Sequence, residues 1–296
     1  MDPRVKPAGD GARIQRFAMQ KWNMIIDVAE CTNCQLCALA AMDEYVGNNW
    51  PGYAAPMPRH GHKWINILQK ERGQQPMIDI AYVPTMCNHC DNAPCLAKGG
   101  DAVKKRDDGI VLIDPEKAKG RKDLVEACPY GHIWWNEELA LPQVWPFDAH
   151  LLDQGWQQTR GQQSCPTGAM RAIKIEDEEM AQLVRDQELE VMKPELGSKP
   201  RVYYRNLWRY SKCFIGGTLA AEINGVVDCV EGATVRLSKD GRSIAETVSD
   251  NFGDFKFDRL DEGSGVYVVE ISAEGWSKKT VEARLGTSIN LGEIRL

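Results

Sequence analysis

Apolar residues in the first two thirds of the chain occur in short segments separated by long loops. Segments in which apolar and polar residues alternate over about four to eight positions predict strands. We expect strands at residues 24–28, 64–68, 78–83 and 110–113, and helices at residues 38–46 and 176–192. Most of the cysteines lie between these elements, so the candidate chemistry is in the loops.

The pattern changes near Lys212. Residues 234–237, 255–257 and 267–271 alternate with a period of two, and glycine-containing turns separate them. Short strands at intervals of about 8–12 residues are typical of a β-sandwich. We therefore expect a flexible N-terminal extension at residues 1–20, a first domain at residues 21–212 and a β-sandwich domain at residues 213–296.

Composition and charge narrow the possible functions. A length of 296 residues suits two domains, and 43% hydrophobic with 26% charged residues is usual for a soluble globular protein. No apolar run approaches the roughly 18 residues of a membrane span, so we expect none. A net charge of −6 gives no electrostatic reason to expect nucleic acid as a partner. Ten cysteines without a secretory signal favour a cytoplasmic protein whose thiols bind metal.

Three cysteines with two residues between neighbours form the first candidate site: Cys31, Cys34 and Cys37. A turn with this spacing directs all three sulfurs into one pocket, where thiolates select zinc, copper or iron-sulfur clusters over hard cations. The bacterial ferredoxin run continues with a fourth cysteine after three more residues. Here that position is Ala41, so the missing ligand must come from a distant part of the chain.

The later cysteines supply the missing partners. A second triplet lies in one loop and two isolated Cys-Pro pairs follow it, giving Cys87, Cys90 and Cys95, then Cys128 and Cys165. Two triplets, each completed by one single cysteine, predict two 4Fe-4S clusters that are each bound by four thiolates. Closed zinc sites also take four thiolates, but they are usually built from two C-x2-C pairs. Counting alone allows either Cys128 or Cys165 to complete the first triplet.

Other candidate residues carry less information. Cys213 and Cys229 lack partners at ligand spacing, and we expect both to be small buried apolar residues. His89 lies inside the second cysteine loop, where it either donates to a cluster sulfur or packs the loop. The sequence offers no Ser-His-Asp arrangement, no Walker loop and no dinucleotide fingerprint, so we expect no active site in this chain.

Several longer motifs resemble those of one protein family. They are DEYVG and WPGY within residues 43–53, CNHC at 87–90, CPYG at 128–131, WNEE at 135–138, HLLD at 150–153 and CPTGA at 165–169. On these residues the chain is similar to the iron-sulfur small (beta) subunits of the DMSO reductase, or molybdopterin oxidoreductase, family. Within that family it resembles the small subunits of pyrogallol-phloroglucinol transhydroxylase and the resorcinol hydroxylases, over about residues 20–296.

The resemblance implies an α+β fold, in which a double ferredoxin-like 4Fe-4S domain precedes an all-β, immunoglobulin-like or transthyretin-like sandwich. It also implies nested ligand sets, with Cys31, Cys34, Cys37 and Cys165 on the first cluster and Cys87, Cys90, Cys95 and Cys128 on the second. Longer relatives have two more ligand sets. Here one set is replaced by Gly99, Ala118, Arg121 and Leu124, and the other by Ala41, Trp145, Asp148 and Gly161.

The family further implies a non-catalytic electron-transfer subunit of a molybdenum or tungsten bis-pyranopterin oxidoreductase of transhydroxylase or hydroxylase type. Its partner would be a large subunit, in a heterodimer or larger assembly, that binds the phenolic or other small substrate. Molybdopterin guanine dinucleotide is expected only in that partner. Two alternatives are mainly structural clusters in a redox-neutral hydroxyl transfer, and a free-standing ferredoxin-like carrier. Trp50 and Tyr53 either contact the partner or cover the chain's own core.

Overall fold

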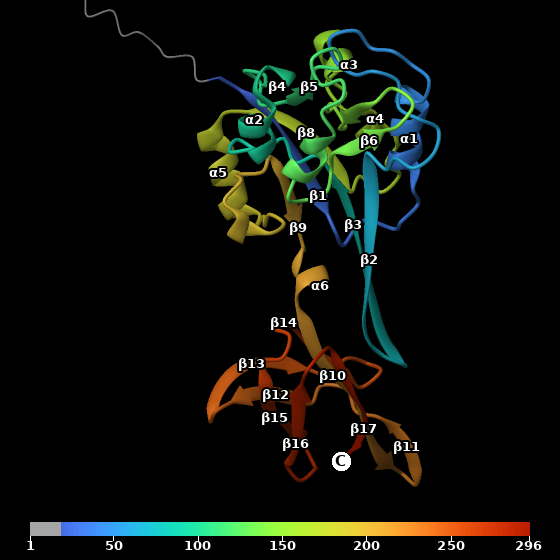
Figure 1. The fold of residues 1–296 in the computed structure, drawn as a ribbon. Coiled ribbons are helices and arrows are strands. Elements are labelled where there is room, and N and C mark those ends of the chain that lie inside the picture. The colour runs from blue at the N-terminus through green and yellow to red at the C-terminus, as the bar shows by residue number, and fades with distance from the viewer. Residues whose placement is uncertain (1–18) are drawn as a thin grey trace, which may run out of the picture.

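The computed structural model describes residues 19–296, so the expected extension at residues 1–20 lies almost entirely outside the described residues. These residues form two parts. The part nearer the N-terminus combines short helices with small sheets, and the part nearer the C-terminus consists of strands (Figure 1). Among the described residues, no helix is both long and apolar enough to cross a membrane.

A three-stranded sheet organises the first part. Its middle strand β1 (Lys21–Asp27) pairs antiparallel with β8 (Met170–Ile175) and parallel with β9 (Val202–Arg205). The five central residues of β1 are all buried, because both faces of the strand are covered. This sheet places β1 beside residues that follow Cys165, about 150 positions later along the sequence.

The helices of the first part are short. The expected helix at 38–46 is confirmed as α1 (Leu36–Tyr45), whereas the helix expected at 176–192 ends early, as α5 (Asp177–Asp186). A capping box between Glu176 and Glu179 begins α5. The remaining elements are α2 (Pro94–Gly99), α3 (Ala149–Asp153), α4 (Arg160–Ser164), β4 (Val103–Lys105), β5 (Val111–Ile113), β6 (Trp134–Asn136), β7 (Leu141–Gln143), η1 (Gly100–Ala102), η2 (Lys122–Ala127) and η3 (Pro194–Leu196).

A long hairpin connects the two parts. Its strands are β2 (Ile65–Gln74) and β3 (Met77–Met86). The first contains the strand expected at 64–68 apart from Trp64 and continues through mainly polar residues, and the second contains the strand expected at 78–83. Figure 1 shows the hairpin reaching down to the second part. Near its tip, Gln74 donates a hydrogen bond from Nε2 to the Ser288 carbonyl oxygen at 2.8 Å.

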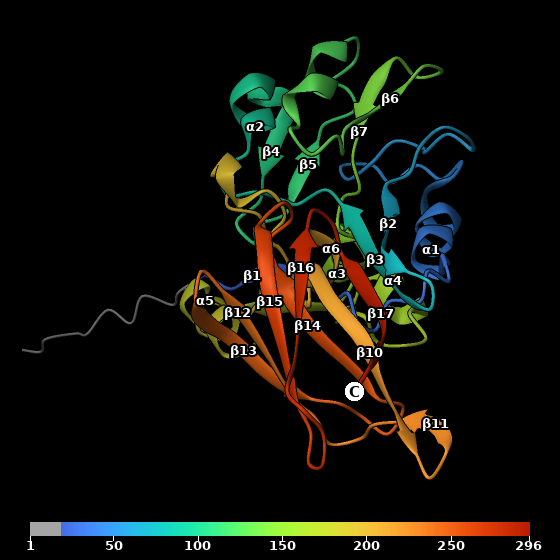
Figure 2. The ribbon, with the colours of Figure 1, turned by 90° about the horizontal axis from the view of Figure 1, so that it is seen from below.

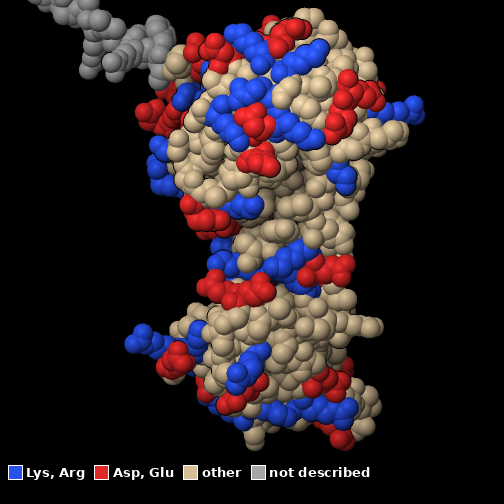
Figure 3. All heavy atoms as spheres, viewed as in Figure 1, with Lys and Arg blue, Asp and Glu red and all other residues tan. Residues whose placement is uncertain are grey.

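An ion-pair network holds this junction. The side chain of Arg72 is only 1% exposed, and it pairs with Asp79 and with Asp258 of the second part. Its guanidinium also lies 5.5 Å from the ring centroid of Phe214, which adds a cation–π contact. On the face shown in Figure 3, acidic and basic side chains gather together at the waist between the two parts.

The second part, reached through α6 (Trp208–Ser211), contains two four-stranded sheets. In one, β10 pairs with β11, β14 and β17, and in the other the order is β13-β12-β15-β16, as Figure 2 shows from below. Buried residues of both sheets, such as Leu219 and Val269, share one hydrophobic core. The strands are β10 (Cys213–Ile223), β11 (Val226–Cys229), β12 (Thr234–Lys239), β13 (Arg242–Val248), β14 (Asp254–Leu260), β15 (Gly265–Ser272), β16 (Lys279–Leu285) and β17 (Ile289–Arg295).

Candidate metal centres

Four thiols from three segments line one cavity. Cys87 and Cys90 follow β3, Cys95 lies in α2 and Cys128 follows η2. The other walls of the cavity are largely apolar, including Val111. We call these four cysteines the inner set, because they lie between the other candidate ligands in the sequence.

The acidity of these thiols shows how they fit a metal. Burial raises the pKa of Cys87 well above its ordinary value and raises that of Cys95 to about 11. The neighbouring Cys128 thiol raises both further, because charges of the same sign repel. Four thiolates in this cavity therefore require a compensating positive charge, which an iron-sulfur cluster or a metal ion bound by soft ligands supplies.

His89 packs the inner loop. The ring is 1% exposed and lies edge-on to Phe147, with ring centroids 5.2 Å apart. Its Nδ1 accepts a hydrogen bond from the Val111 N–H at 3.0 Å, and burial lowers the pKa of the ring to about 3. The imidazole is therefore neutral and carries its proton on Nε2, which has no hydrogen-bond partner among the described residues.

The other four thiols converge at the end of β1. Cys31, Cys34 and Cys37 lie in the loop that enters α1, and Cys165 follows α4, which packs against α1. We call them the outer set. The loop turns tightly because Asn33 and Gln35 both have left-handed backbones, with φ of 58° and 62°. Cys34 is exposed and Cys37 is buried, so the outer set reaches from the core to the surface.

The thiols of the outer set also affect one another's acidity. Burial raises the pKa of Cys37 to about 12, and Cys165 and Cys31 are among the charges that add to this rise. For Cys165 itself, burial acts in the same direction, but hydrogen bonds from Thr167 and from backbone N–H groups, including that of Met170, lower its pKa overall. The structure thus places Cys165 beside the first triplet and Cys128 beside the second.

Hydrocarbon fills the first replaced ligand set, next to the inner cysteines. Ala118 and Leu124 are fully buried in a cluster that also includes Val103. A Cβ on Gly99 would lie only 2.2 Å from Cγ2 of Val103, so no side chain fits there. Arg121 turns outward and pairs with Asp123 at 2.9 Å.

A hydrogen-bonded carboxylate fills the second replaced set. Asp148 is 1% exposed and accepts hydrogen bonds from the Tyr45 hydroxyl at 2.7 Å, Trp145 Nε1 at 2.9 Å and the Arg160 N–H at 2.7 Å. Burial raises its pKa, and these donors oppose that rise. Ala41 is buried in the same hydrophobic core, and a Cβ on Gly161 would lie 3.5 Å from Cβ of Cys37. This replaced set therefore adjoins the outer cysteines.

The expectations for the two unpaired cysteines and for two aromatic residues have different outcomes. Cys213 is buried as expected, but Cys229 is exposed on β11, so the expectation of a buried residue there is wrong. Trp50 stacks on His150 with ring centroids 4.0 Å apart, and Tyr53 donates a hydrogen bond to Asp153 at 2.8 Å. Both aromatic residues thus contact the chain's own side chains.

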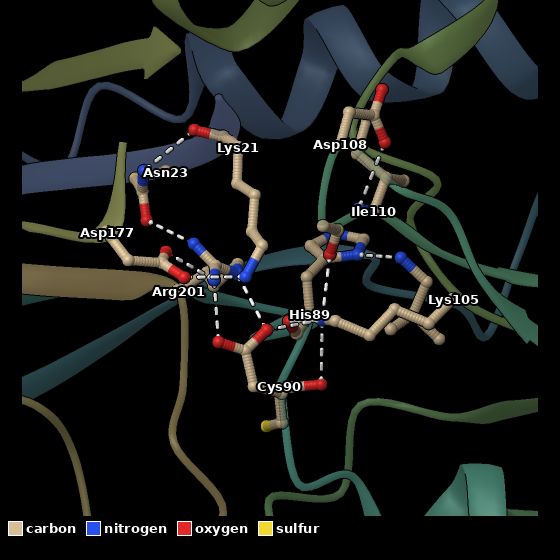
Figure 4. A network of polar contacts seen from close by, with 12 residues as sticks. Lys21, Asn23, His89, Cys90, Lys105, Asp108, Ile110, Asp177 and Arg201 are labelled. Carbon is tan, nitrogen blue, oxygen red and sulfur yellow. Dashed lines mark hydrogen bonds and ion pairs between the residues drawn. The ribbon is translucent and has the colours of Figure 1, made fainter. Parts of the chain in front are cut away.

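A charged network that no sequence pattern indicated lies beside the inner loop. Figure 4 shows the Lys105 side chain reaching between His89 and Cys90, with Arg201 on the side away from the Lys105 backbone. Asp91 lies between these two cations and pairs with both. Arg201 and Asp91 are 110 positions apart, so no local pattern indicates their contact.

Comparisons with known proteins identify the family of this chain. The family model of a 4Fe-4S dicluster domain matches residues 78–175. The small subunit of pyrogallol hydroxytransferase from Pelobacter acidigallici is 48% identical over 94% of this chain and 100% of that protein. The matching tetrathionate reductase subunit from Salmonella typhimurium is 31% identical over 63% of this chain and 73% of its own. The arsenate respiratory reductase iron-sulfur subunit from Shewanella sp. is 31% identical over 45% of this chain and 52% of its own.

Proposed function

Since the chain belongs to the iron-sulfur subunits of the molybdopterin oxidoreductase family, we propose that it holds two 4Fe-4S clusters and transfers electrons for a large catalytic partner. The outer set, Cys31, Cys34, Cys37 and Cys165, binds one cluster, and the inner set, Cys87, Cys90, Cys95 and Cys128, binds the other. The observation that carries this proposal is the convergence of eight thiols into two groups of four.

The residues of this chain hold the clusters rather than react with a substrate. When bound, each cluster supplies a site that accepts or releases one electron. The apolar walls of the inner cavity exclude water from its thiolates, and the backbone N–H groups around Cys165 stabilise negative charge on that sulfur. The exposed Cys34 brings the outer cluster to the surface, where exchange with a partner is possible.

The partner follows from the relatives. We assign the molybdopterin guanine dinucleotide, with molybdenum or tungsten, to a large subunit in a heterodimer or larger assembly. The similarity to the pyrogallol hydroxytransferase small subunit favours a phenolic substrate, bound in that large subunit. No active site is then needed in this chain, and the proposed location is the cytoplasm. The proposed domains are a double ferredoxin-like unit at 21–212 and an immunoglobulin-like or transthyretin-like sandwich at 213–296.

One observation favours a second candidate function. Side chains fill both replaced ligand sets. On the resemblance, two of the clusters that carry electrons in longer relatives would therefore have no site in this chain. If the complex transfers a hydroxyl group without net electron flow, the clusters act mainly by holding their loops in place. Clusters that become reduced during turnover of the complex would exclude this candidate, whereas clusters that keep one redox state would favour it.

Metal analysis tests the proposal. The full chain, purified anaerobically, is expected to contain about eight iron and eight acid-labile sulfide. About four iron, or stoichiometric zinc, would contradict it. Electron paramagnetic resonance of the reduced Cys165→Ser and Cys128→Ser variants then tests the pairing. Cys165→Ser should change the same signal as Cys31→Ser, and Cys128→Ser the same signal as Cys87→Ser; the reverse would establish the crossed pairing.

A further inference from the structure

The inner cysteine loop rests on a single ammonium group. Lys105 Nζ donates hydrogen bonds to the carbonyl oxygens of His89 at 2.8 Å, Cys90 at 2.9 Å and Gly109 at 3.0 Å. It also lies 2.9 Å from Oδ1 of Asp91. The Lys105 side chain is only 20% exposed, so water screens its charge less than it would that of an exposed lysine. The ammonium therefore lies against the backbone of one proposed cluster ligand, Cys90.

The carboxylate beside Lys105 is shared with a second cation. Asp91 accepts hydrogen bonds from Arg201 Nε at 2.8 Å and from Arg201 Nη2 at 2.6 Å. Arg201 is 3% exposed and also pairs with Asp177 at 2.8 Å, which in turn pairs with Lys21 at 2.6 Å. The charges thus alternate from Lys105 to Lys21 (Figure 4), and the Lys105 end lies at the cysteine loop.

Hydrogen bonding alone does not explain ionised groups at this place. Neutral donors also satisfy carbonyl oxygens, whereas a largely buried ion pair carries a desolvation cost. A cluster gains negative charge when it is reduced, and a fixed cation nearby stabilises that reduced form, while a fixed anion destabilises it. Both kinds of charge are present beside Cys90: Lys105 contacts its carbonyl oxygen, and Asp91 follows it in the sequence.

We propose that Lys105 and Asp91 set the reduction potential of the cluster held by Cys87, Cys90, Cys95 and Cys128, with Lys105 raising it and Asp91 lowering it. This inference rests on the proposed function, because it requires a cluster at the inner set. Lys105 and Asp91 are positioning residues that act through the field they create at the inner loop. The outer cluster lies outside their immediate contacts.

A redox titration followed by electron paramagnetic resonance tests the assignment. Lys105→Met is expected to lower the potential of the inner cluster, by up to the 59 mV that corresponds to a tenfold change in a one-electron equilibrium. Asp91→Asn is expected to raise it. Lys105→Arg keeps the charge and should restore the original value. If the two residues were purely structural, Lys105→Met and Asp91→Asn would not shift the potential of the inner cluster in opposite directions.

Control variants separate the possible failures. Lys21→Met removes a cation at the far end of the same network and should leave the potentials of both clusters unchanged. None of the variants should change the potential of the outer cluster. Equal potentials in Lys105→Met, Asp91→Asn and the unmodified chain, or shifts of the same sign, would overturn the inference. Loss of the inner cluster from both variants would also overturn it, because the pair would then be structural. Absence of iron from the unmodified chain would instead refute the proposed function.

Discussion

Two kinds of position lie next to each other in the first part of the chain: those where four thiols converge, and those where the cysteines of longer relatives are replaced. The inner set surrounds a cavity, whereas the neighbouring replaced set is closed by Leu124 and Val103. The replaced set beside the outer cysteines is instead closed by Asp148 and its donors. The two sets of positions that the resemblance marks as replaced are thus filled differently, one by hydrocarbon and the other by a polar network.

The resemblance implies that cysteines are replaced in whole sets, and packing and electrostatics provide a physical reason. A single thiol left among Leu124, Ala118 and Val103 would have no metal to bind, and the cavity around it would be partly empty. Conversely, loss of one thiol from the inner set would leave three that still need positive charge. Only a complete set or a complete replacement satisfies the packing and the electrostatics together.

Removal of one inner thiol is expected to have the largest effect. Cys87→Ser should reduce the iron content from about eight to about four per chain and strongly lower the temperature of unfolding, because metal binding here contributes folding free energy. Iron analysis and circular dichroism measure both quantities. Cys229→Ser, at an exposed cysteine of the second part, is the matched control and should change neither. Full iron content in Cys87→Ser would contradict the ligand assignment.

Truncation at the hydrocarbon-filled set should be the next largest effect. Leu124 has no exposed surface, so Leu124→Ala is expected to lower the free energy of unfolding by about 2–5 kcal/mol. Urea denaturation measures it. The control Leu196→Ala, at a leucine that is 41% exposed, should change it by less than about 0.5 kcal/mol. Similar costs for the two variants would mean that the replaced set is not a packed core.

Truncation at the polar replaced set should lower the free energy of unfolding by about as much as Leu124→Ala does, but through the loss of hydrogen bonds. Asp148→Ala leaves the Tyr45 hydroxyl, the Trp145 N–H and the Arg160 N–H without their acceptor, which should cost about 3 kcal/mol in total. The exposed Asp101→Ala serves as the control in the same urea experiment. Iron content should be unchanged in both. If Asp148→Ala lost iron, the carboxylate would belong to the outer site and not to a refilled one.

Acid should produce the smallest effect, at the junction, which contains neither the proposed cluster ligands nor the replaced positions. Burial raises the pKa of Asp79, but Arg209, Arg72 and Lys256 lower it to about 2, against 3.8 for an ordinary aspartate. The resulting stability, about 2 kcal/mol, is present above about pH 4 and is lost as the pH falls through about 2.

Asp79→Asn provides the comparison for this acid effect. Urea denaturation at several pH values should show a smaller loss of stability between pH 4 and pH 2 in Asp79→Asn than in the unmodified chain. The iron content of the variant at neutral pH should remain that of the unmodified chain. An identical pH dependence in both proteins would mean that the junction does not stabilise the ionised carboxylate.

The elements that the sequence predicted well are those with one buried face or a fully apolar run. The strand at 24–28 and the helix at 38–46 are both found, as are strands at each of the three segments chosen in the second part. The hairpin was predicted only in part, because its outer half is polar and its buried Arg72 depends on Asp258, far away in the sequence. Periodicity contains no information on such pairs.

The cysteines themselves were the strongest local signal, and their spacing needed no tertiary information. The way in which Asp148 or Leu124 fills a replaced set was not predictable, since it depends on contacts between distant segments. Cys229 was wrongly expected to be buried, because it lies on β11, a short strand whose four residues are all exposed. Lys105 was missed because its role depends on three carbonyl groups and not on its neighbours in sequence.

The nesting of the two thiol sets determines when each is complete during synthesis. At about 5–20 residues per second, Cys128 leaves the ribosome roughly 2–7 s after Cys95, whereas Cys165 follows Cys37 by roughly 6–26 s. The inner four thiols are therefore available to the assembly machinery while the outer three still lack their fourth. The strand partners β8 and β9, which hold β1 in place, are also made only after this interval. The growing chain thus completes its inner set of four thiols before its outer set.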